Sequence, residues 1–219
     1  MASFGLRAYL NGPSSRLEAV WLPVHAPSHF PLLQLPSSIQ LSTPTPLGAR
    51  FGNGLGALRL HLERASFDGS ISYLRGPATF PGVVFLDALD VGRLSAGLFW
   101  YRHQVVGADF ATTLGSWGIR GEVAWRDPVD DEPHAPLADL EYVVGFDRDF
   151  WGVSAIAQYI GSYVCDWEDT WSRAAIARAR LPLVESLGQR VVQRIVEKNR
   201  MLHGQLDRVS HAASLRLQK

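Results

Sequence analysis

Two histidines near the N-terminus have a spacing that could support metal chemistry. His25 and His29 are four residues apart in the segment "HAPSH". On a helix this spacing would bring both imidazoles to one face, where they could bind a metal ion. Pro27 stands between them, however, and proline disrupts the interior of a helix. We therefore expect no metal site at these residues.

A second candidate for chemistry is an acidic segment in the middle of the chain. It contains Asp127, Asp130, Asp131 and Glu132. Such a group of oxygen ligands could collect a calcium ion, but its spacing does not fit an EF-hand loop. We interpret it as a solvated acidic loop.

Glu141 and Asp147 raise the possibility of acid–base catalysis by paired carboxylates. No nucleophile, general base or metal pattern accompanies them, and the chain contains no G-x-S-x-G, Walker or H-E-x-x-H motif. The glycine-rich "GNGLGA" (52–57) leads into an alternating segment rather than a helix whose N-terminus could hold phosphate. We predict that the protein is not an enzyme and uses no cofactor.

Composition narrows the functional class further. The 219 residues include 21 basic and 21 acidic side chains, and 19% of residues are charged. This balance predicts no nucleic-acid partner. Cys165 is the only cysteine, so no disulfide can form within the chain. No run reaches 18 apolar residues, which excludes a transmembrane helix but not the strands of a membrane barrel.

The dominant pattern is an alternation of apolar and charged residues. In "SWGIRGEVAWRD" (116–127), Trp117 and Val123 fall on one parity, whereas Arg120 and Glu122 fall on the other. In a soluble sheet the apolar side would face a core and the charged side would face water. In a transmembrane barrel the apolar side would face lipid and the charged side would line the lumen. The alternation alone leaves both possibilities open.

Similar alternation predicts further strands along the chain. The segments are 16–22, 57–64, 67–74, 93–113, 140–150 and 153–164, with the beginning of another strand in 210–219. We expect 93–113 to be one long strand that bends or leaves the membrane near Arg102 and Gln104. Short reversals at 114–116 and 149–152 alternate with a long acidic loop at 127–139 and a long insertion. Short turns on one side and long loops on the other are typical of outer-membrane barrels.

Two segments depart from this pattern. Residues 23–46 contain six prolines and predict an irregular loop. Residues 181–208 change to helical periodicity, which predicts an inserted amphipathic helix that is capped or weakened near Gly204. We expect this helix to pack against the barrel rim or within the lumen. Binding to a membrane surface or to a partner helix remains an alternative.

The segments "VVGADFATTLGSWGIRGEVAWRDP" and "DLEYVVGFDRDFWGVSAIAQYIGSYV" carry a resemblance to a known class of protein. The chain resembles porin-like outer-membrane β-barrel proteins of Gram-negative bacteria, and in particular large uncharacterised barrels. The resemblance covers roughly residues 50–164 well and the helix moderately. It implies passive passage of solutes through a barrel with more strands than this chain supplies, and it brings no catalytic residues. The sequence has no signal peptide and no C-terminal aromatic residue, so we expect a fragment truncated at both ends.

These observations predict one domain over residues 1–219, an all-β antiparallel transmembrane β-barrel that is partial, with roughly 8–10 strands and one inserted helix. Its partners would be outer-membrane lipid and small solutes. The predicted lumen-lining residues are Arg59, His61, Glu63, Asp109, Arg120, Glu122, Arg126, Glu141, Asp147 and Gln158. The predicted lipid-facing aromatic girdle consists of Trp100, Trp117, Trp125, Tyr142 and Trp151.

The spacing of two tryptophans favours the membrane interpretation. Trp117 and Trp125 are eight residues apart, roughly 26 Å along a strand, which approaches the height of an apolar membrane band once tilt is included. Two alternatives remain. A soluble ligand-binding β-barrel would enclose its ligand with the apolar parity. An outer-membrane barrel could instead act through its loops as an adhesin or enzyme.

Overall fold

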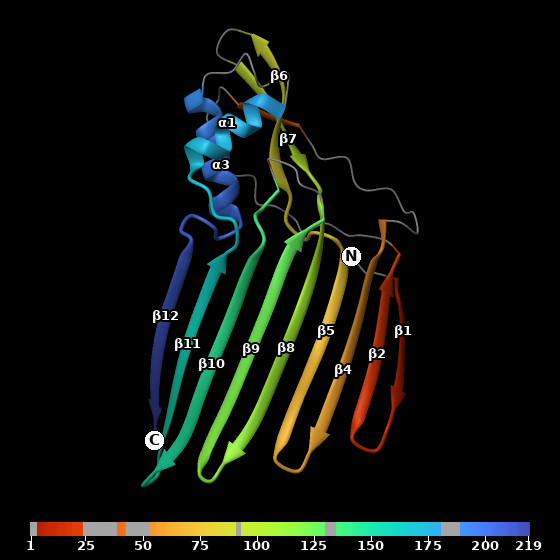
Figure 1. The fold of residues 1–219 in the computed structure, drawn as a ribbon, viewed down its shortest axis with the longest axis vertical. Coiled ribbons are helices and arrows are strands. Elements are labelled where there is room, and N and C mark those ends of the chain that lie inside the picture. The colour runs from red at the N-terminus through yellow and green to blue at the C-terminus, as the bar shows by residue number, and fades with distance from the viewer. Residues whose placement is uncertain (1–3, 24–38, 43–52, 91–92, 130–134, 181–188) are drawn as a thin grey trace.

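The computed structural model describes residues 4–23, 39–42, 53–90, 93–129, 135–180 and 189–219. Within these residues, nine strands form one large antiparallel sheet (Figure 1). In spatial order the strands are β1 (Leu6–Asn11), β2 (Ser15–Leu22), β4 (Leu55–Arg64), β5 (Phe67–Pro77), β8 (Arg102–Leu114), β9 (Trp117–Pro128), β10 (Asp139–Phe150), β11 (Val153–Val164) and β12 (Val209–Gln218). The prediction of a mostly antiparallel β-sheet architecture is therefore confirmed.

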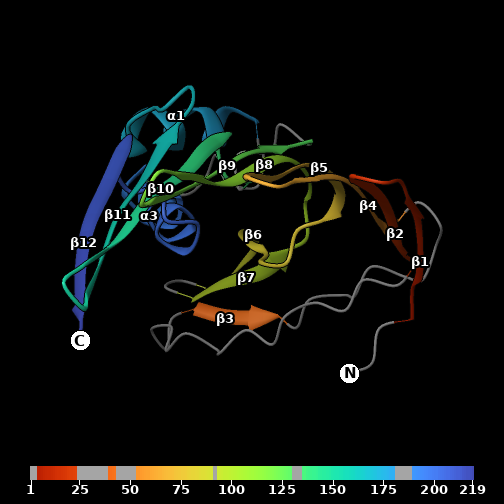
Figure 2. The same cartoon turned by 90° about the horizontal axis from the view of Figure 1, so that it is seen from below.

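The large sheet is curved but open. Figure 2 shows it as an arc, with β1 and β12 at its two edges and the smaller strands on its concave side. The two edge strands do not pair with each other, so the sheet is not closed into a barrel. We call the outer surface of the arc the convex face and the inner surface the concave face.

The connections at the two ends of the sheet differ in length. At one end, which we call the turn end, β1–β2, β4–β5, β8–β9 and β10–β11 are joined by short hairpin turns. Gly115 and Gly152 have positive φ values of 62° and 80° in two of these turns. Two-residue hairpins commonly need such conformations, which glycine adopts without strain. The predicted reversals at 114–116 and 149–152 are confirmed.

The opposite end, which we call the loop end, carries the long connections and a second sheet. This sheet has the order β3 (Ile39–Ser42), β7 (Arg93–Phe99) and β6 (Gly82–Asp90). β3 falls within the segment predicted to be an irregular loop, in a stretch without proline, whereas residues 24–38 and 43–46 lie outside the described residues.

Residues 93–113 form two strands rather than one long strand, and the break lies next to Arg102, where a bend was expected. The chain leaves the small sheet after Phe99 and enters the large sheet at Arg102. Between them, Tyr101 is buried, its carbonyl accepts a 2.9 Å hydrogen bond from the Ala78 amide, and its ring packs edge-on against His203. These contacts fix the position of the break between β7 and β8. The apolar alternation continues across it, so parity alone could not reveal it.

Two helices cover the loop end near β10–β12 (Figure 1). They are α1 (Thr170–Arg180) and α3 (Gln189–Leu202). α3 confirms the central part of the helix predicted at 181–208, and its end is followed by Gly204 with φ +70°, a conformation typical of helix C-termini. Residues 181–188 lie outside the described residues. The predicted helix extends too far at its C-terminal end, because α3 ends at Leu202.

α1 was not predicted from the sequence. Asp169 caps it: one carboxylate oxygen accepts hydrogen bonds from the amides of Trp171 and Ser172 at 2.9 and 2.8 Å. These bonds satisfy backbone donors that the first turn of a helix otherwise leaves unpaired. They also lower the pKa of the Asp169 carboxyl.

Apolar burial is confined to the loop end among the residues whose side chains the structure describes. The buried apolar side chains are Ala78, Tyr101, Ala135, Val164, Ala174, Val192 and Val196. They belong to the helices and to segments adjoining the ends of strands. Among the described side chains, none forms an apolar core against either face of the central part of the large sheet. No helix in the described parts of the chain is long and apolar enough to cross a membrane.

Candidate lumen wall and outer band

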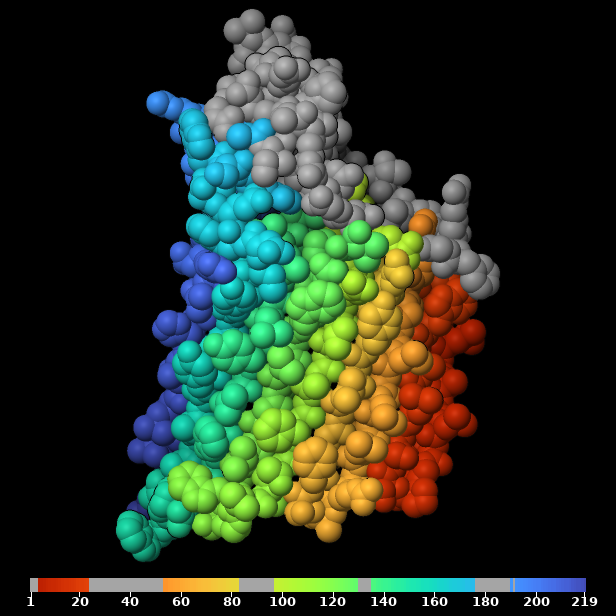
Figure 3. Space-filling model, viewed as in Figure 1, coloured from red at the N-terminus to blue at the C-terminus, as the bar shows by residue number. Residues whose placement is uncertain are grey.

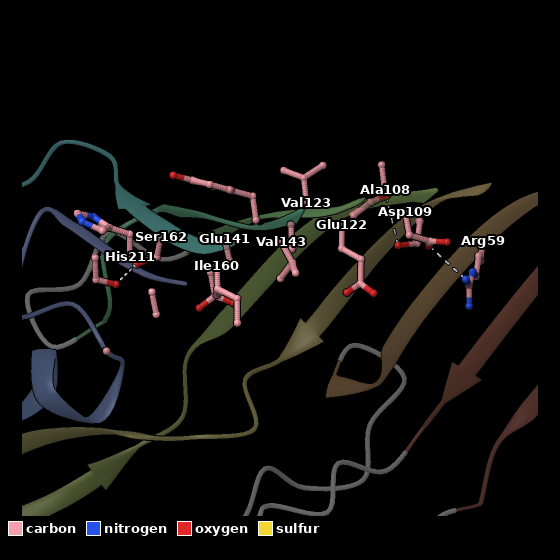
Figure 4. A pocket seen from close by; sticks show the side chains of 18 residues that line it. Arg59, Ala108, Asp109, Glu122, Val123, Glu141, Val143, Ile160, Ser162 and His211 are labelled. Carbon is pink, nitrogen blue, oxygen red and sulfur yellow. Dashed lines mark hydrogen bonds and ion pairs between the residues drawn. The ribbon is translucent and has the colours of Figure 1, made fainter. Parts of the chain in front are cut away.

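The strand register brings the ten predicted lumen residues to one face of the large sheet. Asp109 pairs across strands with Glu122, and Ala111 pairs with Arg120. Directly paired residues project to the same face, and residues two apart along a strand do likewise. Figure 4 shows Glu122 and Glu141 projecting into the hollow on the concave side, whereas Val123 projects to the opposite side. The charged parity therefore lines the concave face, which we call the wall.

The wall borders an open hollow of about 870 Å³ along β4, β5 and β8–β12. Arg59, Asp109, Glu122 and Glu141 contribute charged side chains to its lining (Figure 4). Small residues such as Gly107 keep the space between them open. A hollow of this size with a charged lining is suited to water and polar solutes.

One polar cluster on the wall joins three strands. Arg59 on β4 donates hydrogen bonds to Ser70 on β5 at 2.9 Å and to Asp109 on β8 at 3.2 Å. The Ser70 hydroxyl in turn donates to the Asp109 carboxylate. On the same face, His61 Nε2 lies 3.6 Å from the Asp68 carboxylate. Arg59 and Asp109 thus form an ion pair that Ser70 joins on this part of the wall.

A second polar cluster lies where β9 and β10 approach the loop end. Arg126 donates two 2.8 Å hydrogen bonds to Asp139 and one of 2.6 Å to Glu141. The two-point geometry to Asp139 matches the planar guanidinium to the carboxylate. Nearer the turn end, Arg120 forms an exposed ion pair with Asp147. Asp139 was not among the predicted residues, although its parity matches that of Glu141 and Asp147.

Gln205 connects this cluster to the segment that follows α3. Its side-chain nitrogen donates to the Leu137 carbonyl at 2.7 Å and to Asp139 at 2.8 Å, and its oxygen accepts from the Leu137 amide at 2.9 Å. The residue is only 2% exposed. Because all these polar atoms are paired, the helical insertion is fixed to the start of β10.

The loop end also buries a titratable group. Burial lowers the pKa of His203 to about 4, with a further contribution from the positive charge of Arg126. The Tyr101 ring packs edge-on against it, with centroids 5.7 Å apart. Burial also raises the pKa of Tyr101. Both side chains are therefore neutral near pH 7.

The convex face exposes large apolar side chains along the whole sheet. Every one of its nine strands contributes. Examples in spatial order are Leu10, Leu17, Leu60, Ile71, Phe110, Trp117, Phe146, Tyr159 and Leu215. Ile71 is 61% exposed and Leu215 is 69% exposed, although both lie within strands. We call this surface the outer band.

Two convex glycines are covered by aromatic rings from neighbouring strands. Phe110 lies over Gly121, and Tyr142 lies over Gly161. A Cβ atom at either glycine would overlap the ring. The rings lie flat along the strands and fill the spaces above these glycines, which gives the outer band a continuous surface.

The outer band ends in polar groups toward the loop end. The Tyr73 hydroxyl lies 3.3 Å from the Gln104 side chain, which donates a 2.9 Å hydrogen bond to Asp127. All three residues have convex parity on neighbouring strands. Convex-facing positions that hold leucine and phenylalanine in the middle of the sheet therefore hold polar residues at this border.

The predicted girdle residues occupy several positions. Trp117, Trp125 and Tyr142 lie on the convex face by register. Trp151 lies in the β10–β11 turn and is fully exposed. Trp100 lies in the link between β7 and β8, and its indole nitrogen is buried, so it lies outside the exposed outer band.

The metal interpretations receive no support from the described part of the chain. No group of three or more histidine, cysteine or acidic side chains there could hold a metal ion. His25, His29, Asp130, Asp131 and Glu132 lie outside the described residues. Comparison with known proteins gives no match to family models, curated proteins or solved structures. The porin-like resemblance therefore stays a prediction.

Proposed function

We propose that the chain forms part of the wall of an outer-membrane β-barrel through which small solutes pass passively. The observation that carries the proposal is the orientation of the two faces of the sheet. The outer band is apolar and exposed, whereas the wall is charged and borders a hollow of about 870 Å³. This is the arrangement of a transmembrane barrel that has lipid outside and water inside.

Exposure of the outer band is difficult to reconcile with water as its solvent. Apolar patches on soluble monomers usually extend over roughly 300–600 Å². Here exposed apolar side chains occur on all nine strands of the large sheet. Contact with lipid would remove this apolar surface from water. It would leave no backbone group of the inner strands without a hydrogen bond, because these strands are paired on both sides within the sheet.

The curvature disfavours a soluble ligand-binding barrel. Such a barrel would enclose its ligand with the apolar parity and present the charged parity to water. The sheet curves in the opposite sense: Val123 projects from the convex side and Glu122 projects into the concave hollow (Figure 4). The proposal also requires the free edges of β1 and β12 to pair with further strands, because an unpaired edge is not tolerated in lipid.

Membrane insertion can be tested with brominated lipids, which quench the fluorescence of nearby tryptophans. The purified chain would be reconstituted in phosphatidylcholine vesicles and floated on a density gradient after a high-salt wash. We expect flotation and strong quenching of Trp125 on the outer band. Trp167 is the matched control, because it packs under Arg200 at the loop end, with 5.3 Å between the guanidinium carbon and the ring centroid.

The contributions of the two tryptophans are separated by the variants Trp125→Phe and Trp167→Phe. The first should remove part of the quenchable signal, because Trp117 on the outer band also contributes to it, and the second should remove little. Recovery of the chain as a stable soluble monomer in buffer without lipid or detergent would contradict membrane insertion.

Passage of solutes is tested separately by swelling of vesicles in a neutral sugar. Tight vesicles containing inserted protein would contradict the transport proposal alone.

A further inference from the structure

One charged residue interrupts the apolar parity of β10 near the turn end. Leu140, Tyr142, Val144 and Phe146 alternate along the convex face, and Arg148 takes the next position. A charge on a lipid-facing parity is expensive at mid-membrane but favourable at the border, where headgroups carry phosphate. Arg148 is two residues from the end of its strand, which is a border position.

Aromatic rings hold the Arg148 guanidinium on two sides. Its central carbon lies 4.9 Å from the Trp117 ring centroid and 4.6 Å from the Phe150 ring centroid. The two rings are themselves 6.1 Å apart and nearly perpendicular. Such ring contacts favour a cation and restrict the side chain, so less motion is lost when its donors bind a ligand.

The donors of Arg148 have no carboxylate partner among the described residues. The adjacent acidic residues project to the wall, where Asp147 pairs with Arg120 and Asp149 accepts a hydrogen bond from Ser154. The Arg148 Nε atom is buried and has no hydrogen-bond partner in the described structure. This differs from Arg59, Arg120 and Arg126 on the wall, each of which has a carboxylate partner. Arg148 therefore retains its capacity to bind an anion.

Trp151 adds an exposed ring in the turn, three residues after this arginine. It occupies the β10–β11 turn with φ +49°, a conformation that is unfavourable for a bulky residue. Its side chain is fully exposed. Figures 1 and 3 show this turn extending to the far tip of the turn end. The positive φ belongs to the two-residue hairpin that Trp151 forms with Gly152. The full exposure of the indole is explained if it lies among lipid headgroups, where its apolar body and polar nitrogen are both accommodated.

We propose that Arg148, held between Trp117 and Phe150 near the turn that contains Trp151, binds the phosphate of an anionic lipid headgroup and anchors the turn end at the membrane border. This inference rests on the proposed membrane function and adds a lipid class and a binding residue to it. The guanidinium edge would donate to the phosphate oxygens, while the rings would lie against the upper acyl chains.

The test compares flotation of the full chain with phosphatidylcholine vesicles and with vesicles containing phosphatidylglycerol. We expect the parent to bind the anionic vesicles more tightly. Arg148→Gln should lower this preference about fivefold, as expected for one basic residue at a charged membrane surface. Arg148→Lys should restore part of it, because it keeps the charge but not the planar fork.

Arg64→Gln is the matched control, because Arg64 also lies on the convex parity at the turn end but is on β4, distant from the ring cluster. As a basic residue without ring contacts, Arg64 contributes only general attraction to the anionic surface, so Arg64→Gln should lower the preference less than Arg148→Gln does. Phe150→Leu provides a second test that leaves the charge unchanged, and it should weaken the preference if the ring positions the guanidinium. Circular dichroism of each variant establishes that the sheet is retained.

The outcomes separate the two proposals. Equal binding of the parent to both vesicle types, or an unchanged preference in Arg148→Gln, would overturn the headgroup site and leave membrane insertion intact. Loss of the preference in excess inorganic phosphate, with salt matched, would show a general anion site and overturn the lipid assignment. Failure of the parent to insert into either vesicle would overturn the proposed function together with this inference.

Discussion

The two faces of the large sheet share one backbone but have opposite chemistry. On β10, Val144 belongs to the convex outer band and Val143 to the concave hollow beside Glu122. A soluble sheet would place its apolar face against a core, yet apolar burial in the described residues occurs only at the loop end. The two faces therefore differ in which side of the curved sheet they occupy, and neither is distinguished by packing against an apolar core.

The largest expected effect comes from charging the outer band. Val144→Arg would place a guanidinium near the middle of the proposed lipid-facing surface and should destabilise the inserted protein by about 2–4 kcal/mol. Val143→Arg is the matched control, because it introduces the same side chain on the adjacent, hydrated face and should cost far less. Unfolding by urea in vesicles measures both. Equal costs would remove the distinction between the faces.

Acid should weaken the loop end, where the buried apolar contacts of the described residues lie. The pKa of His203 is lowered to about 4 in the folded protein from an ordinary value of 6.5. The unfolded chain therefore binds a proton first as pH falls through this window, and up to about 3 kcal/mol of stability should be lost. Thermal unfolding between pH 7 and pH 4 measures this change.

His203→Phe is expected to remove this component of the acid response, because it keeps a ring against Tyr101 without a titratable group. His61→Gln should retain it, because His61 lies on the exposed wall far from Tyr101. An acid response that persisted in His203→Phe would place its cause elsewhere.

A smaller effect should distinguish the buried and exposed ends of the wall. Asp139→Asn weakens the two-point contact with Arg126 and disturbs Gln205, so we expect a cost of about 1–3 kcal/mol. Asp147→Asn changes an exposed pair with Arg120 and should cost less than about 1 kcal/mol. Urea midpoints give both values, and the reverse order would contradict the burial argument.

The smallest effect on stability is expected at Glu122. This exposed wall residue has no ion-pair partner in the described part of the chain, so Glu122→Gln should change stability by less than about 0.5 kcal/mol. It should nevertheless lower the preference for cations over anions, because it removes a negative charge from the hollow. Reversal potentials in an asymmetric salt gradient measure this. An unchanged potential would place Glu122 outside the solute path.

Much of the wall could be predicted from sequence because strand parity has only two outcomes. Once Glu122 is assigned to one face, Arg120 and Arg126 follow, and antiparallel pairing carries the assignment to Asp109 and Glu141. Glycine and the short "DFWG" segment likewise indicated the turns. These features are local, so a single sequence contains the information for them.

Features set by contacts between distant segments were missed. The chain leaves one sheet and enters another around Tyr101, whose buried ring packs against His203 about a hundred residues later. Gln205 likewise pairs with Leu137 and Asp139 across a long insertion. The alternation of residues along one strand carries no information about contacts between distant segments. Arg148 was missed for a different reason. A single charged residue on an otherwise apolar face of a strand does not by itself indicate a binding site, and its contacts with Trp117 and Phe150 are visible only in the structure.

The direction of the two edge strands restricts how this sheet could close. In an antiparallel sheet of nine strands, β1 and β12 run in the same direction. Copies arranged around a shared axis would therefore join β12 of one copy to β1 of the next in parallel. An all-antiparallel closure instead requires an odd number of additional strands between these edges. The total would then be even, as in bacterial outer-membrane barrels formed from a single chain.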